Sequence, residues 1–209
     1  VGATYLRDIR PGELLVLNRD NILIEDDFVQ HTQQTVCAME YVYFARPDSD
    51  IHGTNIYAAR NNMGKKLAIE SFVGADIVTG VPDSSISAAI GFAEQTGIPY
   101  ELGLIKNRYT GRTFIQPNQE LREQGVKMKL SAVRKVVEGK RVIMIDDSIV
   151  RGTTSLRIVN LLREAGAAQV HVRISSPPFM NPCFYGIDTP SRKDLIAANY
   201  TVEEIREKI

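Results

Sequence analysis

The feature that most constrains the fold is a regular alternation of strands and helices that begins near residue 54. Apolar strands are expected at 75–81, 141–145 and 170–174, and helical periodicity occupies segments between them, including 126–137. Strands joined through helices form parallel sheets with right-handed crossovers. We therefore predict an α/β fold with a mostly parallel sheet flanked by helices, in which ligands bind outside the carboxyl ends of the strands.

The first 35 residues follow a different pattern. Two short apolar strands, at 14–17 and 22–24, are separated by a polar turn. Two strands alone are not stable in water, and the rest of the chain offers no obvious partner sheet. We therefore interpret residues 1–35 as a short β remnant of another domain and residues 36–209 as the main domain.

Charge and apolar patterning exclude several classes of protein. Lys plus Arg and Asp plus Glu both number 25, so the chain lacks the excess of cations that a nucleic-acid-binding protein uses. No apolar run is long enough to predict a membrane span, and no signal-peptide pattern opens the sequence. Cys37 and Cys183 do not make a disulfide framework. We expect a cytoplasmic protein with no nucleic-acid or membrane partner.

The run from Val142 to Ser155 carries the chemistry that a phosphorylated sugar requires. It begins as an apolar strand and continues through a loop into the start of a helix. Gly152 and the hydroxyl residues after it would expose backbone N–H groups at the amino end of that helix, which favours phosphate. Asp146 and Asp147 would repel phosphate and suit sugar hydroxyls or a bridging Mg²⁺. Together these residues predict a ribose 5-phosphate site; the alternative is a helix cap beside solvated acids.

A polar segment from Lys106 to Ile115 is expected to form part of a long loop. It carries Lys106, Arg108 and Arg112 together with Tyr109, and three cations on one loop suit a pyrophosphate leaving group. A loop of this kind can close over a reacting sugar and exclude water. The alternative is a solvated basic loop.

The run Asp146–Ser155 resembles the phosphoribosylpyrophosphate (PRPP) motif of the type I phosphoribosyltransferases. Other stretches resemble the glutamine-dependent branch of that family, whose members commit PRPP to purine synthesis. These stretches are Glu40–Ser49, Gly80–Ser85, Lys106–Ile115 and Tyr185–Asp188. Together they cover nearly all of residues 37–209, and the resemblance implies the type I phosphoribosyltransferase fold.

The resemblance also implies a role for each candidate residue. Asp146 and Asp147 would bind the ribose hydroxyls and Mg²⁺. Ser84 would lie near the pyrophosphate and the metal, although a serine at this place can equally cap a helix. The catalytic loop that folds over PRPP would contain Lys106, Arg108, Tyr109 and Arg112. The 5-phosphate would be held by Ser148, Arg151, Gly152, Thr153, Thr154 and Ser155.

The activity implied by the resemblance is that of a pentosyltransferase, a class of glycosyltransferase. Ammonia, supplied from glutamine in the full enzyme, would react with PRPP to give 5-phosphoribosylamine and pyrophosphate, the first committed step of purine (IMP) synthesis. Purine nucleotides would act as feedback inhibitors, and the parent protein would form a homo-oligomer. Two alternatives stay open: a PRPP-binding regulator of transcription, and a salvage enzyme that joins PRPP to a free purine or pyrimidine.

Two further properties of the family require cysteines, and this sequence contains only some of them. A Bacillus-type subset holds a [4Fe–4S] cluster on four cysteines, and Cys37 and Cys183 match two of those positions. Because such a cluster requires four thiolates, we do not expect it to be complete here; two buried thiols are the alternative. The family's glutaminase half begins with a nucleophilic cysteine, whereas this chain begins with Val1. Residues 1–35 resemble only the last strands of that glutaminase domain. We therefore expect a fragment, truncated at both ends, that keeps this remnant and lacks the rest of the glutaminase domain and its activity.

Overall fold

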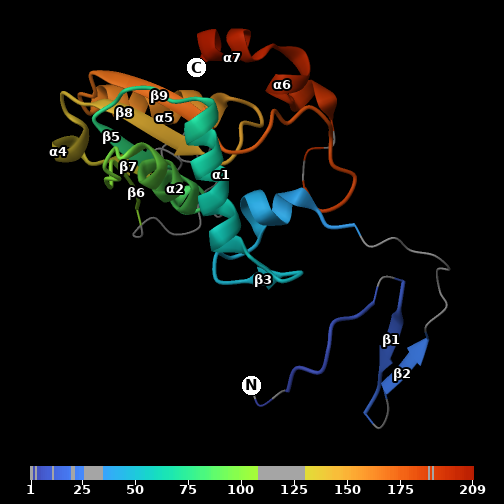
Figure 1. Ribbon diagram of the computed structural model, residues 1–209. Coiled ribbons are helices and arrows are strands. Elements are labelled where there is room, and N and C mark those ends of the chain that lie inside the picture. Colours follow the sequence, from blue (N-terminus) through green and yellow to red (C-terminus); the bar gives the residue numbers. More distant parts are fainter. Residues whose placement is uncertain are drawn as a thin grey trace. The chain divides into compact units, whose positions relative to one another are not determined.

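The computed structural model describes residues 2, 4–10, 12–19, 22–25, 35–107, 130–187, 189 and 191–209 (Figure 1). The chain divides into two compact units, Val1–Ala38 and Met39–Ile209. Within the described residues, no helix is long and apolar enough to cross a membrane. The assignment of the first 35 residues to a glutaminase domain stays a prediction.

The first unit contains an antiparallel pair of strands, β1 (Leu14–Leu17) and β2 (Ile22–Glu25). Both strands lie where the sequence predicts them. An ion pair between Arg7 and Glu13 joins the preceding segment to the residue just before β1. Among the described residues of this unit, Tyr5, Leu6, Ile9 and Leu17 are exposed, so these apolar side chains are not buried in a core of the kind that stabilises a larger sheet.

A three-stranded parallel sheet forms the centre of the second unit. Its strands are β5 (Ile77–Gly80), β8 (Arg141–Asp146) and β9 (Gln169–Ile174), in the spatial order β5-β8-β9. A parallel bridge between Val78 and Tyr100 continues the pairing beyond β5. The predicted parallel sheet is therefore confirmed, and the residues that follow its central strand lie at the carboxyl edge, between the ends of two neighbours.

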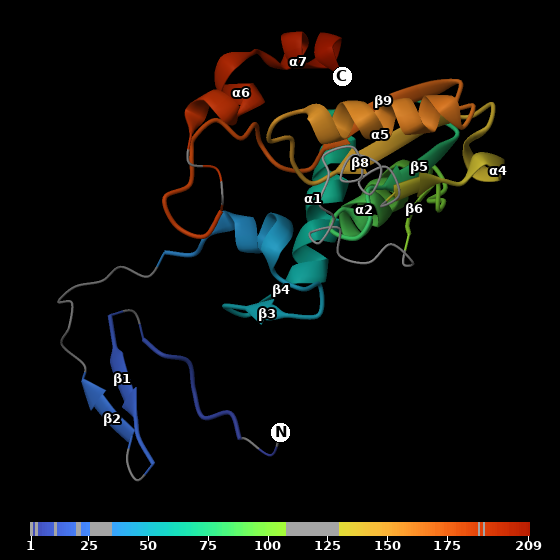
Figure 2. The ribbon, with the colours of Figure 1, turned by 180° about the vertical axis from the view of Figure 1, so that it is seen from behind.

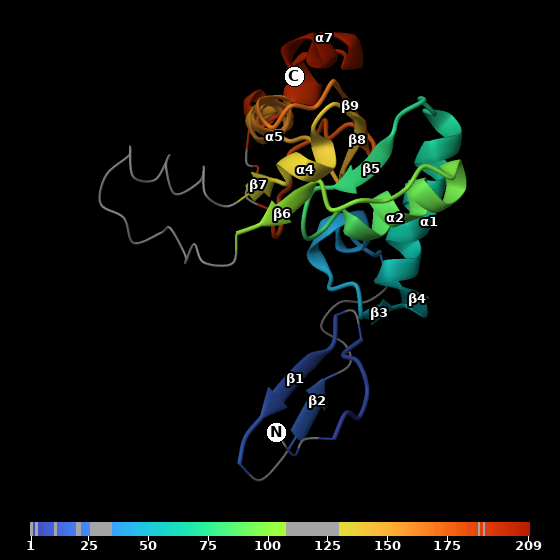
Figure 3. The same cartoon turned by 90° about the vertical axis from the view of Figure 1, so that its left-hand side faces the viewer.

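Helices cover both faces of this sheet (Figures 2 and 3). On one face α1 (Ile56–Glu70) packs against α2 (Ile86–Thr96), and on the other lies α5 (Thr153–Glu164). The side chains of β8 alternate between the two faces, which explains why this strand is apolar at successive positions. The residues that pack with α5 are Val142 and Met144, and those that pack with α2 are Ile143 and Ile145.

Another antiparallel pair, β6 (Leu104–Lys106) and β7 (Leu130–Ala132), precedes the short helix α4 (Arg134–Val137). The sequence predicts one helix over 126–137; this prediction is wrong at Leu130–Ala132, which form a strand, and is confirmed at Arg134–Val137, which form α4. Hydrogen bonding to β6 makes β7 a strand, and its apolar side chains reach the same core that a helix face would have met. Residues 126–129 lie outside the described residues.

Smaller elements flank this framework. Before α1 come the π-helix η1 (Glu40–Phe44) and the strands β3 (Asp50–Ile51) and β4 (Thr54–Asn55). After β9 come η3 (Arg192–Asp194), α6 (Ile196–Asn199) and α7 (Val202–Lys208). The backbone N–H of Ile196 donates to the carbonyl of Val150 at 2.8 Å, which attaches these last helices to the loop before α5.

Candidate active site

Two buried carboxylates lie at the carboxyl end of the central strand. Asp146 is the last residue of β8 and Asp147 follows it, and they are only 7% and 6% exposed. The backbone N–H of Asp147 donates to Oδ1 of Asp146 at 2.9 Å, which fixes one carboxylate against the next residue. The sequence predicts both carboxylates at this edge of the sheet, and the structure places them there.

Serine hydroxyls from two loops surround this pair. Ser84 and Ser85 follow β5, whose end is joined to β8 by a hydrogen bond from Val81 N to the carbonyl of Ile145. The Ser84 hydroxyl donates to Oδ2 of Asp147. The Ser85 hydroxyl lies 3.1 Å from Oδ1 of Asp146 and 3.4 Å from Oδ2 of Asp147. From the other side, the Ser148 hydroxyl donates to Oδ1 of Asp147.

Burial and the neighbouring carboxylate perturb Asp146. Loss of contact with water raises the pKa of Asp146 to about 7, and the neighbouring charge of Asp147 contributes to the same increase, while the N–H of Asp147 and the hydroxyl of Ser85 act in the opposite direction. The ionised form of a buried carboxylate is stabilised by a nearby cation or by hydrogen-bond donors. Two carboxylates side by side therefore suit sugar hydroxyls or a hard divalent cation.

The loop after the carboxylates leads into α5, and its geometry exposes backbone N–H groups. Gly152 adopts a left-handed conformation with φ of 81°, and a Cβ atom at this position would lie 2.7 Å from Cδ1 of Ile196. The N–H groups of the first turn, at Thr153 and Thr154, have no partner within the helix. Because the positive end of the helix dipole lies here as well, this turn is suited to an anion.

A pocket of about 490 Å³ opens beside this turn. Arg151, Gly152 and Thr153 line one side of it, and residues of the last three helices line the other, including Lys193 and Lys208. Arg151 is exposed and lies 3.8 Å from Asp194 in a loose ion pair. The predicted phosphate residues are therefore accessible at Arg151, Thr153 and Thr154, whereas Ser155 is only 3% exposed.

Of the four side chains predicted to act in the catalytic loop, Lys106, at the end of β6, is the one that lies among the described residues. Its Nζ donates to Oδ2 of Asp83 at 2.8 Å, next to the serine loop that holds the carboxylates. In the β6–β7 pair Lys106 lies opposite Leu130, so the two ends of the connecting segment are adjacent. The other predicted members lie outside the described residues: Arg108, Tyr109 and Arg112.

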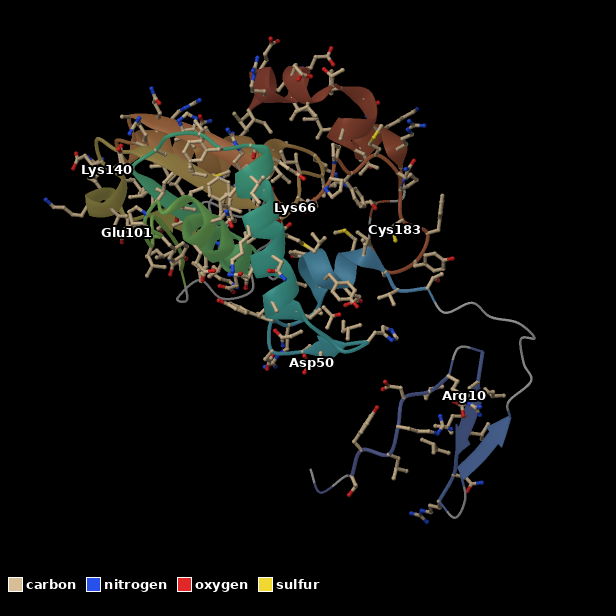
Figure 4. The ribbon with its side chains drawn as sticks, in the orientation of Figure 1. Arg10, Asp50, Lys66, Glu101, Lys140 and Cys183 are labelled. Atoms are coloured by element: carbon tan, nitrogen blue, oxygen red, sulfur yellow. The ribbon has the colours of Figure 1, made fainter. Side chains whose placement is uncertain are left out.

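The two cysteines occur in different units and are both free. Cys37 is exposed in the first unit, and Cys183 is half-buried in the segment between β9 and η3 (Figure 4). The backbone N–H of Tyr185 donates to Sγ of Cys183 at 3.4 Å, and this bond lowers the pKa of the thiol. No group of three or more potential metal ligands occurs within the described ranges. Two thiols do not fit a complete [4Fe–4S] cluster, which takes four.

Sequence reasoning missed two residues near the carboxylates. Ser85 ends the stretch Gly80–Ser85 but has no predicted role, and its contacts with both acids depend on the pairing of β5 with β8. Arg60, on α1, is 3% exposed and donates to the carbonyls of Tyr41 and Ala45, each at 2.8 Å. Burial lowers its pKa, and the charge of Asp147 acts in the opposite direction. The helical periodicity of the sequence does not predict a buried arginine whose pKa is influenced by the charge of Asp147.

Curated proteins match this chain closely, although no family model does. The amidophosphoribosyltransferase of Bacillus subtilis is 68% identical over all 209 residues, which make up 44% of that protein. Amidophosphoribosyltransferases of Staphylococcus aureus and Synechocystis are 56% and 55% identical over the whole chain, each with 42% of its length covered.

Solved structures agree with these relatives. The glutamine PRPP amidotransferase of B. subtilis, complexed with ADP and GMP, matches 99% of this chain at 68% identity with a TM-score of 0.84. A structure described as the allosteric regulatory enzyme of purine biosynthesis matches the same share with a TM-score of 0.85. The chain spans less than half the length of these proteins. The resemblance seen in the motifs is thus confirmed: along its whole length, the chain is related to the amidophosphoribosyltransferases.

Proposed function

We propose that this chain carries the PRPP-binding and phosphoribosyl-transfer site of an amidophosphoribosyltransferase. Mg²⁺-PRPP and ammonia, supplied from glutamine in the whole protein, would give 5-phosphoribosylamine and pyrophosphate. The observation that carries the proposal is the pair of buried carboxylates at the end of β8, followed by the left-handed Gly152 and the open first turn of α5. The names of the close relatives support the same reaction.

In this proposal Asp146 and Asp147 accept hydrogen bonds from two ribose hydroxyls. The donor set also fits Mg²⁺, which prefers oxygen ligands and is commonly held by one or two carboxylates together with substrate phosphates. When bound, the ion would neutralise charge on the pyrophosphate as it leaves. Ser84, which donates to Asp147, would lie near the metal and the pyrophosphate.

The two phosphate-bearing ends of PRPP would meet different parts of the chain. The 5-phosphate would bind the first turn of α5, held by Ser148, Arg151, Gly152, Thr153, Thr154 and Ser155. The pyrophosphate would meet Lys106 and, as predicted from sequence, Arg108, Tyr109 and Arg112. The ion pair between Lys106 and Asp83 supports this division because it brings the end of β6 to the loop after β5.

The reaction itself requires no nucleophile from the protein. The lone pair of ammonia forms the new bond to the anomeric carbon while the bond from that carbon to the pyrophosphate oxygen breaks. The electron pair of the broken bond leaves with pyrophosphate, and the new ammonium group gives a proton to solvent. The chain would contribute by orienting the sugar and stabilising the charge that develops.

Further partners are inferred from a relative and from the family resemblance of the motifs. Purine nucleotides would inhibit the site, since the B. subtilis structure is described as a complex with ADP and GMP. Cys37 and Cys183 would supply two of four ligands to an iron–sulfur cluster in the longer protein. We also infer a homo-oligomeric, cytoplasmic protein.

Pyrophosphate release from Mg²⁺-PRPP by the purified protein tests the proposal, with ammonia and glutamine compared as nitrogen donors. Release that depends on ammonia, and that falls at least about a hundredfold when Asp147 is replaced by Asn, is the expected result. Release that depends on a purine or pyrimidine base would indicate a salvage enzyme instead. Tight PRPP binding without release under either donor would indicate a regulatory module.

A further inference from the structure

We infer that Ser85 positions the carboxylate pair so that both acids can engage the ribose hydroxyls at the same time. The inference rests on the proposed function and adds a residue to it. Ser85 is 0% exposed, so its side chain cannot touch the substrate and acts only through Asp146 and Asp147. Its hydroxyl lies within hydrogen-bonding distance of both of them.

The helix that follows Ser85 does not use this hydroxyl. A serine at the residue before a helix commonly accepts a hydrogen bond from an N–H of the first turn. Ser85 occupies that position before α2, yet its side chain makes no such bond. Its backbone is nevertheless fixed, because its N–H donates to Val81 at 3.2 Å and its carbonyl accepts from Ala89 at 2.9 Å. The hydroxyl is thus held on a rigid support and turned toward the acids.

Within the described residues, Ser85 is the one side chain that links the two acids. Ser84 and Ser148 both donate to Asp147. In the described part of the chain, the Asp146 carboxylate accepts only from the Ser85 hydroxyl and the N–H of Asp147. Two neighbouring buried carboxylates repel one another, and the single hydroxyl proton of Ser85, which either carboxylate can accept, opposes their separation. Small errors in such spacing weaken a bidentate site strongly.

Isothermal titration with two probes tests this role in the presence of Mg²⁺. Ribose 5-phosphate carries both the hydroxyls and the phosphate, whereas inorganic phosphate carries no hydroxyl pair. The Ser85→Ala variant should bind ribose 5-phosphate about tenfold more weakly and inorganic phosphate within about twofold of the parent protein. The KM for PRPP should rise by the same factor while kcat stays within about threefold.

A matched control and a milder variant separate positioning from folding. Ser87 lies in the first turn of α2, is 5% exposed and makes no hydrogen bond to either acid within the described residues. The Ser87→Ala variant should therefore bind ribose 5-phosphate and inorganic phosphate with unchanged affinity. If Ser85→Ala does not fold, Ser85→Cys keeps a similar shape with a weaker donor and should show an intermediate loss.

The possible results distinguish a failure of the proposed function from a failure of the role of Ser85. A parent protein that binds neither ribose 5-phosphate nor PRPP would overturn the proposed function, and the role of Ser85 with it. A parent protein that binds both, with Ser85→Ala unchanged toward ribose 5-phosphate, would overturn the role of Ser85 alone. Equal weakening of ribose 5-phosphate and inorganic phosphate in Ser85→Ala would also overturn it, because the defect would then not concern the hydroxyls.

Discussion

Replacing Asp146 with asparagine is expected to make the folded protein more stable above pH 7 while it weakens the proposed substrate site. Asp146 is 7% exposed and lies beside a second carboxylate, so its ionised form is unfavourable in the folded state. Asparagine keeps an oxygen that can accept from the N–H of Asp147, and it removes the charge. Opposite effects on stability and binding are typical of residues that serve a ligand rather than the fold.

The size and sign of the effect follow from the pKa of Asp146, which rises from 3.8 to about 7 on folding. Below about pH 4 the group is protonated in both the folded and the unfolded state and costs nothing. As pH increases from about 4 to 7, the unfolded chain loses the proton first, so the free energy of unfolding falls. Above about pH 7 the cost levels off at about 4 kcal/mol, since one pKa unit corresponds to about 1.4 kcal/mol. The Asp146→Asn variant should recover about 2–4 kcal/mol of this, because the amide is itself a buried polar group.

Urea denaturation of the parent and Asp146→Asn between pH 4.5 and 8.5 measures this difference. Its expected course is a small value at pH 4.5 that grows in favour of the variant and levels off above pH 7. Asp76→Asn is the matched control at the opposite end of the sheet. Arg141 lowers the pKa of Asp76 to about 2, so this carboxylate stabilises the fold above about pH 4 and the stabilisation is lost as pH falls toward 2. A loss of stability in Asp146→Asn at pH 8, or a difference independent of pH, would refute the reasoning.

Three further substitutions test separate parts of the structure. Gly152→Ala would force a left-handed alanine and a methyl group 2.7 Å from Ile196, so it should lower the free energy of unfolding by about 1–3 kcal/mol and weaken phosphate binding; an unchanged melting temperature would contradict this. Lys106→Gln breaks an exposed ion pair with Asp83, so melting should change little, whereas pyrophosphate release at saturating PRPP should fall at least about tenfold. Thr201→Ala removes the capping box of α7 and should lower the free energy of unfolding, measured by urea denaturation, by about 1 kcal/mol; an unchanged value would show that α7 does not unfold cooperatively with the rest.

Much of the second unit follows from local sequence pattern. The central strand β8 is apolar at successive positions because both of its faces are covered, and this marks it as a buried parallel strand without knowledge of its neighbours. The change from that strand to Asp146, and then to Gly152 and a helix, also places the acids and the open first turn of α5 at the same edge. These features depend on residues close together in the sequence.

The parts that sequence pattern missed depend on contacts between distant segments. Leu130 and Val137 fit a helical period equally well, yet pairing with β6 makes the first a strand residue and leaves the second on a short helix. The contacts of Ser85 with both acids require β5 to lie beside β8. Likewise, the buried position of Arg60 depends on the carbonyls of the segment 41–45 that it binds.

Amide chemical shifts of ¹⁵N-labelled protein titrated with PRPP and Mg²⁺ test the central claim most directly. We expect saturable changes at Asp147 and at Gly152 through Ser155, where the strand end meets the first turn of α5. Amides at the opposite end of the sheet, near Asp76 and Lys140, should stay constant and report that the fold is intact. Changes confined to other regions, or no change at Gly152–Ser155 at saturating PRPP, would contradict the assignment of this edge as the PRPP site.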